Sequence, residues 1–173
     1  FAIVDNQYPN MLQSFGLLRT NLLKQVVYKR PSYHAMQHMV NLLHSGVKPS
    51  GRPAFTVNTA REIALVGLSD ADDKSVGVMY WYSDRIPGDE LAWDRVEMSV
   101  EGLSLEDPVL VDAVTGRVYD LPQPHGSRDG GRMKLTGCPV WDAPMLLLER
   151  SAVPFRGEAA ERKAAGSSQD MLY

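Results

Sequence analysis

The sequence predicts a mainly β protein, in which a short strand-and-helix segment precedes a C-terminal, jelly-roll-like β-sandwich. From residue 54 onward, short apolar strands recur at roughly 10–12-residue intervals, a spacing typical of sandwiches and jelly rolls. Before them lies one amphipathic helix, expected over residues 31–45. Between helix and strands, residues 47–53 read VKPSGRP, and their two prolines and glycine predict a linker.

The N-terminal segment contains short apolar runs that are too brief for helices. Residues 1–4 (FAIV) fit a strand buried on both faces, as in a parallel barrel, and residues 5–10 form a polar loop after it. Residues 15–20 form a second short apolar run, and residues 26–28 (VVY) read as a strand leading into the helix.

The helix has clear start and stop signals. Pro31 suits the first helical position, where its missing N–H costs nothing, and Gly46 suits the position after the last turn. An apolar stripe follows helical spacing along Tyr33, Met36, Met39, Val40, Leu42 and Leu43. We expect the helix to dock through this stripe, with Met36 buried, on the sandwich or on the N-terminal strands.

The sandwich strands are expected at residues 63–68, 76–82, 95–101, 109–111, 118–119, 133–135 and 145–148. Residues 95–101 alternate cleanly, with Arg95, Glu97 and Glu101 outward. The predicted core of the sandwich consists of Val78, Tyr80, Val96, Met98, Val100, Val109 and Val111. The predicted organisation is residues 1–46 as strand and helix, 47–53 as linker, 54–156 as sandwich and 157–173 as a flexible tail.

Composition narrows the class of function. The net charge of the 173 residues is −3, and no basic stripe interleaved with aromatic residues is present, which argues against nucleic-acid binding. No apolar run approaches the ~18 residues needed to cross a bilayer, so no membrane partner is expected.

The first residue is Phe1 inside an apparent strand, so we expect a piece of a longer protein, whose compartment stays unknown. The single cysteine, Cys138, is expected to be a buried, inert thiol.

Two groups of residues resemble metal sites, but a structural role is the preferred interpretation of each. His34 and His38 have the i, i+4 spacing of a zinc-binding helix, but Ala35 stands where a metalloprotease has its glutamate. Asp70, Asp72 and Asp73 crowd one loop that lacks the glycine and distal glutamate of an EF-hand, and a solvated hairpin tip is favoured. We therefore expect no metal and no cofactor.

Aromatic residues are the candidate sugar contacts. Trp81 lies in a strand that is apolar on both faces, which favours core packing. Trp93 and Trp141 lie in loops beside Asp94 and Asp142, where packing and a ligand or interdomain contact are both open. No pair of carboxylates stands out as catalytic, because those in turns and at strand ends are commonly structural.

Several segments resemble the C-terminal region of clan A glycoside hydrolases, the retaining (β/α)8-barrel enzymes with an appended β-sandwich. These are residues 14–19 (SFGLLR) and 27–37 (VYKRPSYHAMQ), with 108–112 (PVLVD), 115–122 (TGRVYDLP) and 142–147 (DAPMLL) in the sandwich. The likeness covers about residues 1–155 and rests on structural motifs. It implies that residues 1–46 are the last strand and helix of a TIM barrel, and that the sandwich braces this barrel.

The resemblance implies a glycosidase of carbohydrate metabolism that acts on an oligo- or polysaccharide, with both catalytic carboxylates upstream of Phe1. No catalytic residue is therefore assigned, and we expect the chain alone to be inactive. Loops after barrel strands form the active-site face, so Asp5, Asn6, Gln7 and Tyr8 are candidate sugar contacts, with a solvated loop as the alternative. Two other functions stay open: a non-catalytic carbohydrate-binding module and a structural sandwich that mediates protein contacts.

Overall fold

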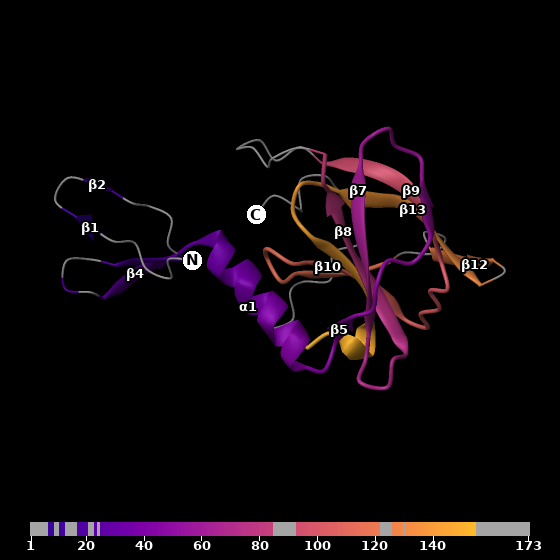
Figure 1. The fold of residues 1–173 in the computed structure, drawn as a ribbon, viewed down its shortest axis with the longest axis horizontal. Helices are drawn as coiled ribbons and strands as arrows, with labels where there is room; N and C mark the ends of the chain where they lie inside the picture. The colour runs from indigo at the N-terminus through magenta and orange to yellow at the C-terminus, as the bar shows by residue number, and fades with distance from the viewer. Residues whose placement is uncertain are drawn as a thin grey trace.

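The structure is a computed structural model that describes residues 7–8, 11–12, 17–20, 23, 25–84, 93–121, 126–129 and 131–154. It is mainly β, with several antiparallel sheets (Figure 1). Its elements are β1 (Gln7–Tyr8), β2 (Met11–Leu12), β3 (Leu18–Thr20), β4 (Val26–Lys29), α1 (Pro31–His44), β5 (Lys48–Pro49), β6 (Phe55–Val57), β7 (Ile63–Ser69), β8 (Ser75–Tyr82), β9 (Asp94–Glu101), β10 (Pro108–Asp112), β11 (Val118–Asp120), β12 (Gly126–Asp129), β13 (Arg132–Val140), β14 (Met145–Glu149) and the 3₁₀ turn η1 (Arg150–Ala152).

Two antiparallel sheets pack face to face and enclose the inner core. One sheet has the strand order β11-β10-β14-β8-β7-β5, and the other has the order β12-β13-β9-β6. The inner core is built mainly from side chains of β7, β8 and β14 on one side and of β9 and β13 on the other, and it includes Tyr80, Met98 and Leu135. Burying these two apolar faces against each other is the main source of stability for such a pair of sheets.

The six-stranded sheet is buried on its outer face as well. A second cluster, here called the outer core, covers that face and consists of Leu42, Val47, Leu68, Val76, Val109, Val111, Ala113, Leu146 and Leu148, with Met39, Met79, Val118, Ala152 and Val153 packed against it. The C-terminal half of α1 and the residues around η1 supply the covering side chains. Burial on both faces explains why β14 reads MLLL without alternation.

Helix α1 forms as expected, but a different side of it is buried. It begins at Pro31 and ends at His44, with Ser45 as C-cap and Gly46 beyond it at a φ of +94°. Leu42 is buried and Met39 packs beside it, whereas Met36 is 41% exposed. The expectation that Met36 is buried is therefore wrong, because the apolar stripe is wider than the strip of sheet that α1 crosses.

The N-terminal strands form two hairpins. β1 pairs with β2 and β3 pairs with β4, both antiparallel, and both hairpins lie beyond the N-terminal end of α1, away from the two large sheets (Figure 1). The run at residues 1–4 lies outside the described residues.

Within the segment 47–53, Lys48 and Pro49 pair with Ser69 and Leu68 of β7, so this connection contributes a strand to the six-stranded sheet.

The strand registers confirm part of the predicted sandwich core. In β9, Val96, Met98 and Val100 are buried while Arg95, Glu97 and Glu101 are exposed, as the alternation predicts. Val78 and Tyr80 join the same inner core. The assignment of Val109 and Val111 to that core is wrong. They lie in the outer core, because β10 presents Leu110 to the inner face and its two neighbours to the opposite one.

We predict that Leu42→Ala lowers the free energy of unfolding of the chain by about 2–5 kcal/mol, since it opens a cavity beneath α1. Leu42 is 1% exposed, and Leu43, which follows it on the same helix, is 46% exposed. Leu43→Ala is the matched control and should change stability by less than about 0.5 kcal/mol. Urea unfolding of both variants measures the difference. Equal effects would show that α1 is not held through Leu42.

Candidate functional site

The residues predicted to contact sugar are not brought into one site. Asp5 and Asn6 lie outside the described residues, and Tyr8 belongs to β1. Trp93 is half-buried next to β9, with the Arg95 guanidinium carbon 5.5 Å from its ring centroid. Trp141 is half-buried between β13 and β14 and packs against the inner core. Both tryptophans therefore have structural contacts, and their roles in sugar binding stay predictions.

A polar cluster, the Arg61 cluster, closes one end of the sandwich and consists of Arg61, Tyr82, Asp84, Asp94 and Asp142. The Arg61 guanidinium carbon lies 3.6 Å from the centroid of the Tyr82 ring. Arg61 donates to both carboxylate oxygens of Asp84, from Nη2 at 2.7 Å and from Nε at 3.1 Å, and its Nη2 also reaches Asp142 at 3.4 Å. The Tyr82 hydroxyl donates to Asp94 at 3.0 Å.

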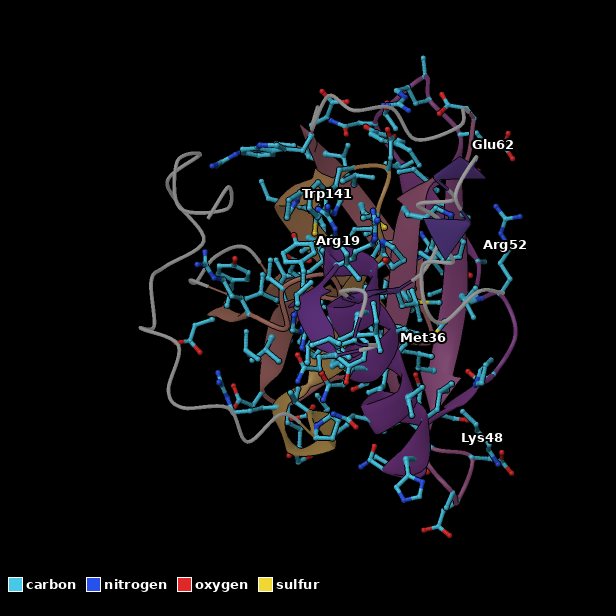
Figure 2. The ribbon with its side chains drawn as sticks, turned by 90° about the vertical axis from the view of Figure 1, so that its left-hand side faces the viewer. Arg19, Met36, Lys48, Arg52, Glu62 and Trp141 are labelled. Atoms are coloured by element: carbon cyan, nitrogen blue, oxygen red, sulfur yellow. The ribbon has the colours of Figure 1, made fainter. Side chains whose placement is uncertain are left out.

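The strand pairing explains why these residues meet. Arg61 precedes β7 and Tyr82 ends β8, and the start of β7 pairs with the end of β8. Asp94 begins β9 opposite the end of β13, and Asp142 follows β13. Trp141 and Glu62, the neighbour of Arg61, lie toward the upper end of the sandwich in Figure 2, whereas Lys48 lies at the lower end. The cluster thus ties the two sheets together at one end.

The electrostatics of the cluster suit a structural role. Hydrogen bonding to Asp84 raises the pKa of Arg61, so its charge is permanent. Burial, and then the hydrogen bond to Asp94, raise the pKa of Tyr82. A general acid needs a carboxyl group in an apolar setting, whereas Asp84 and Asp142 face an arginine. The cluster can order strand ends and present polar atoms to a ligand, but it does not form an acid–base pair.

A second contact joins α1 to the hairpin between β10 and β11. His38 Nδ1 lies 3.0 Å from the carbonyl oxygen of Ala113. The His38 ring also lies against Gly116, where a Cβ would come within 2.5 Å of Nε2, and Gly116 has a φ of +72°. The buried Asp112 carboxylate accepts the Val114 N–H at 2.8 Å and the Thr115 hydroxyl at 2.6 Å, which fixes the turn under the helix. His38 is thus an interface histidine.

The other candidate ligands have local partners. His34 is exposed, with its ring 5.4 Å from that of Tyr33. In the β7–β8 hairpin, Asp70 Oδ1 accepts the backbone N–H groups of Asp72 and Lys74, and Asp73 pairs with Lys48 at 2.7 Å. Among the described residues, no group of three or more His, Cys, Asp or Glu side chains is placed to hold a metal ion.

No helix in the described part of the chain is both long and apolar enough to cross a membrane.

The aspartates of other turns also have structural partners. Arg150 binds Asp107 at 2.6 Å and Asp120 at 2.5 Å, and these hydrogen bonds raise its pKa. Glu149 accepts the backbone N–H groups of Glu106 and Asp107. These contacts agree with the expectation that turn carboxylates in the sandwich are structural.

Two hollows lie on the surface of the sandwich. One, of about 270 Å³, lies on the outer face of the four-stranded sheet and is lined by Thr56, Val57, Asn58, Glu97, Met98, Ser99 and Lys134. The other, of about 280 Å³, lies between β7–β8 and the segments around Arg52 and Gly102. Neither contains an aromatic side chain, and both are smaller than the usual pocket for an organic ligand.

Comparisons with protein-family models, with curated proteins and with solved structures found no match to this chain. The sequence did not predict two contacts that are central to the arrangements described above. These are the contact of Arg61 with Asp84 and Asp142, and the contact of His38 with Ala113. The only sequence signals were a charged residue just outside a strand run and a histidine on a helix, which are too common to identify either contact.

We predict that Arg61→Met lowers the free energy of unfolding by about 1–3 kcal/mol, because it leaves two partly buried carboxylates without their donor. Arg132→Met is the control. It removes an exposed pair with Glu101 and should cost less than about 1 kcal/mol. A double-mutant cycle with Asp84→Ala measures the coupling. Absence of coupling between Arg61 and Asp84 would contradict the cluster geometry.

We predict that Cys138 resists alkylation in the native chain at about pH 8 and reacts on unfolding, because only the thiolate attacks. Burial raises the pKa of Cys138 to about 12 from an ordinary value of 9.0.

The same shift makes stability depend on pH. Below about pH 9, the Cys138 thiol is neutral in both the folded and the unfolded state. As the pH rises from about 9 toward 12, only the unfolded state ionises, so stability falls. Comparing the alkaline slope with that of Cys138→Ala isolates this effect, and equal slopes would contradict it.

Proposed function

We propose that this chain is the C-terminal part of a carbohydrate-active glycoside hydrolase, in which the sandwich braces a (β/α)8 catalytic barrel. In this proposal, residues 1–46 supply the last strand and helix of the barrel, and α1 is that helix. The catalytic carboxylates lie outside this chain, and the oligo- or polysaccharide binds through the barrel. The contribution of these residues to the reaction is mechanical, because they hold the last barrel helix in place.

One observation carries the proposal: α1 has apolar residues on two sides, and the sandwich covers only one of them. Met39 and Leu42 pack in the outer core, and His38 contacts the β10–β11 hairpin. Met36, Val40 and Leu43, at i, i+4 and i+7, are 41%, 56% and 46% exposed. A helix shared between two layers needs this distribution, since each layer buries its own stripe.

The placement of the aromatic residues supports a bracing role over a binding module. A sugar-binding sandwich would present a row of exposed aromatic rings on one face. Among the described residues, every exposed large hydrophobic side chain lies between Leu23 and Leu43, before the sandwich begins. Trp81, Trp93 and Trp141 are each half-buried in or beside strands of the sandwich.

A carbohydrate-binding module is the second candidate, and one specific observation favours it. The half-buried Trp141 adjoins Asp142 of the Arg61 cluster, so an aromatic ring and polar groups lie at the same end of the sandwich. Isothermal titration of the chain with oligosaccharides tests this candidate. Binding that Trp141→Ala abolishes, with the fold retained, would favour the module over the brace.

We predict that the full-length parent hydrolyses at least one aryl β-glycoside and that residues 1–173 alone hydrolyse none. A retaining glycosidase needs two carboxyl groups roughly 5 Å apart, one of them with a raised pKa. The described carboxylates pair with arginine, lysine, a tyrosine or a threonine hydroxyl, or backbone N–H groups. A panel of aryl glycosides, assayed with both proteins, checks the prediction.

Two outcomes would refute the assignment. The first is turnover by the isolated chain that disappears when an acid within residues 54–155 is replaced. The second is a parent that lacks an alternating strand–helix pattern upstream and turns over no glycoside. As a control for the brace, Leu42→Asp in the parent should reduce thermal stability while leaving the KM of the surviving folded enzyme unchanged.

A further inference from the structure

Strand β6 is an edge of the sandwich, because it ends the strand order of the four-stranded sheet. In the described part of the chain it pairs with β9 alone. Its sequence is FTV, and residues 53–60 (PAFTVNTA) contain no charged residue. The other edge strands of the two large sheets are β5 (KP), β11 (VYD) and β12 (GSRD), and each of them contains a charged residue. Charges on an edge oppose pairing with another chain, so β6 is the edge with the least protection of this kind.

The hydrogen bonds between β6 and β9 show which backbone groups of β6 are used. Before the strand, the Glu101 N–H donates to the Ala54 carbonyl oxygen at 2.9 Å, and after it the Asn58 N–H donates to the Glu97 carbonyl oxygen at 3.1 Å. Bonds of this kind recur at every second residue of an antiparallel pair. Thr56 lies midway between them in the same register, so its N–H and C=O point toward β9.

Phe55 and Val57 therefore direct their backbone N–H and C=O groups away from β9, toward the open edge. Among the described residues, none of these four groups has a hydrogen-bond partner. The side chains of both residues are half-buried and pack against the inner core, whereas the Thr56 side chain is exposed on the opposite face of the sheet. The open side of β6 is thus a row of backbone donors and acceptors, and an extended strand is the partner that satisfies such a row.

The spacing of these groups is self-complementary. When a second copy pairs antiparallel with β6 about a two-fold axis at Thr56, Phe55 of each copy lies opposite Val57 of the other. Each of the two pairs exchanges both of its N–H···O=C bonds, which satisfies all the open groups of both strands. The axis also brings the two Thr56 side chains together as a non-hydrogen-bonded pair, with their Cβ atoms about 5 Å apart.

We propose that β6 is a dimerisation edge, through which two copies of this chain join their four-stranded sheets into one continuous antiparallel sheet. The contact is isologous and closes after two copies, because each copy uses its own β6. Phe, Thr and Val all favour extended backbone, and no charge in either strand opposes the pairing. The interface is small, so we expect weak association, with half of the chain dimeric at roughly 10⁻⁴ M. This inference does not depend on the proposed function.

Two other uses of the edge fit the observations less well. A strand from a different protein would satisfy the same backbone groups, but β6 has no charged side chain with which to select a partner sequence. Pairing of β6 with the β11 edge of another copy would be head-to-tail and would produce an open fibre. In β11, Asp120 is already bound by Arg150, which adds a charged pair to that edge.

The test places charges at the two-fold axis. In homodimers of Thr56→Lys or of Thr56→Glu, like charges face each other, so we expect each variant to raise the dimer dissociation constant at least about fivefold. An equimolar mixture of the two places Lys opposite Glu and should form dimers at least as tightly as the unmodified chain. Thr136→Lys is the matched control, because it adds the same charge at an exposed residue of β13, which β9 separates from β6. It should leave the dissociation constant unchanged.

Sedimentation of residues 1–173 over about 10 μM to 1 mM measures the association, and thermal unfolding of each variant verifies its fold. An unmodified chain that stays monomeric throughout this range would overturn the proposal, as would a dimer that neither Thr56 variant weakens. A ladder of larger species would show head-to-tail pairing and would also overturn it. A mixture of the Lys and Glu variants that stays monomeric would overturn it too, even where each variant alone is monomeric, because complementary charges at a real two-fold contact restore the dimer.

Discussion

The rest of this structure depends on burying both faces of the six-stranded sheet. Its inner face packs on the four-stranded sheet, and its outer face needs a cover of its own, because Leu146, Leu148, Val109 and Val111 would otherwise face water. The C-terminal half of α1 provides that cover through Met39 and Leu42. This requirement determines where the helix lies, and therefore which of its side chains stay exposed. The position of the N-terminal hairpins follows from the helix axis (Figure 1).

The Arg61 cluster and helix α1 consequently have different mechanical roles. At one end of the sandwich, Arg61 neutralises Asp84 and Asp142 and stacks on Tyr82, so its polar groups hold the strand ends in register. Alongside the six-stranded sheet, α1 links the sandwich to a basic and apolar segment that has no cover among the described residues. The charged and polar groups of the Arg61 cluster pair with one another. Helix α1 is suited to transmitting a mechanical constraint between two layers, which is the property that the proposed brace requires.

The local features of the chain could be predicted because neighbouring residues determine them. Pro31 and Gly46 bound the helix, and the period of two in residues 95–101 places Val96, Met98 and Val100 in the core whatever lies opposite. Other strands were harder to predict. Residues 136–140 continue β13 beyond the short run at 133–135, although Gly137 and Pro139 are residues that usually interrupt a strand. Pairing with β9 on both sides of a bulge keeps this segment in the sheet.

The sequence by itself determined the helix, most of the sandwich strands, the burial of Cys138 and the outward face of β9. Only the tertiary structure decided which side of α1 is covered, because Met36, Met39, Leu42 and Leu43 are all apolar and the choice depends on where the sheet lies. The same holds for Val109 and Val111, which are buried on the outer face only because a helix covers it. The Arg61 cluster likewise joins residues more than 80 positions apart, from Arg61 to Asp142. A periodic pattern specifies that a side chain is buried, but the partner that buries it is set by the packing of distant elements.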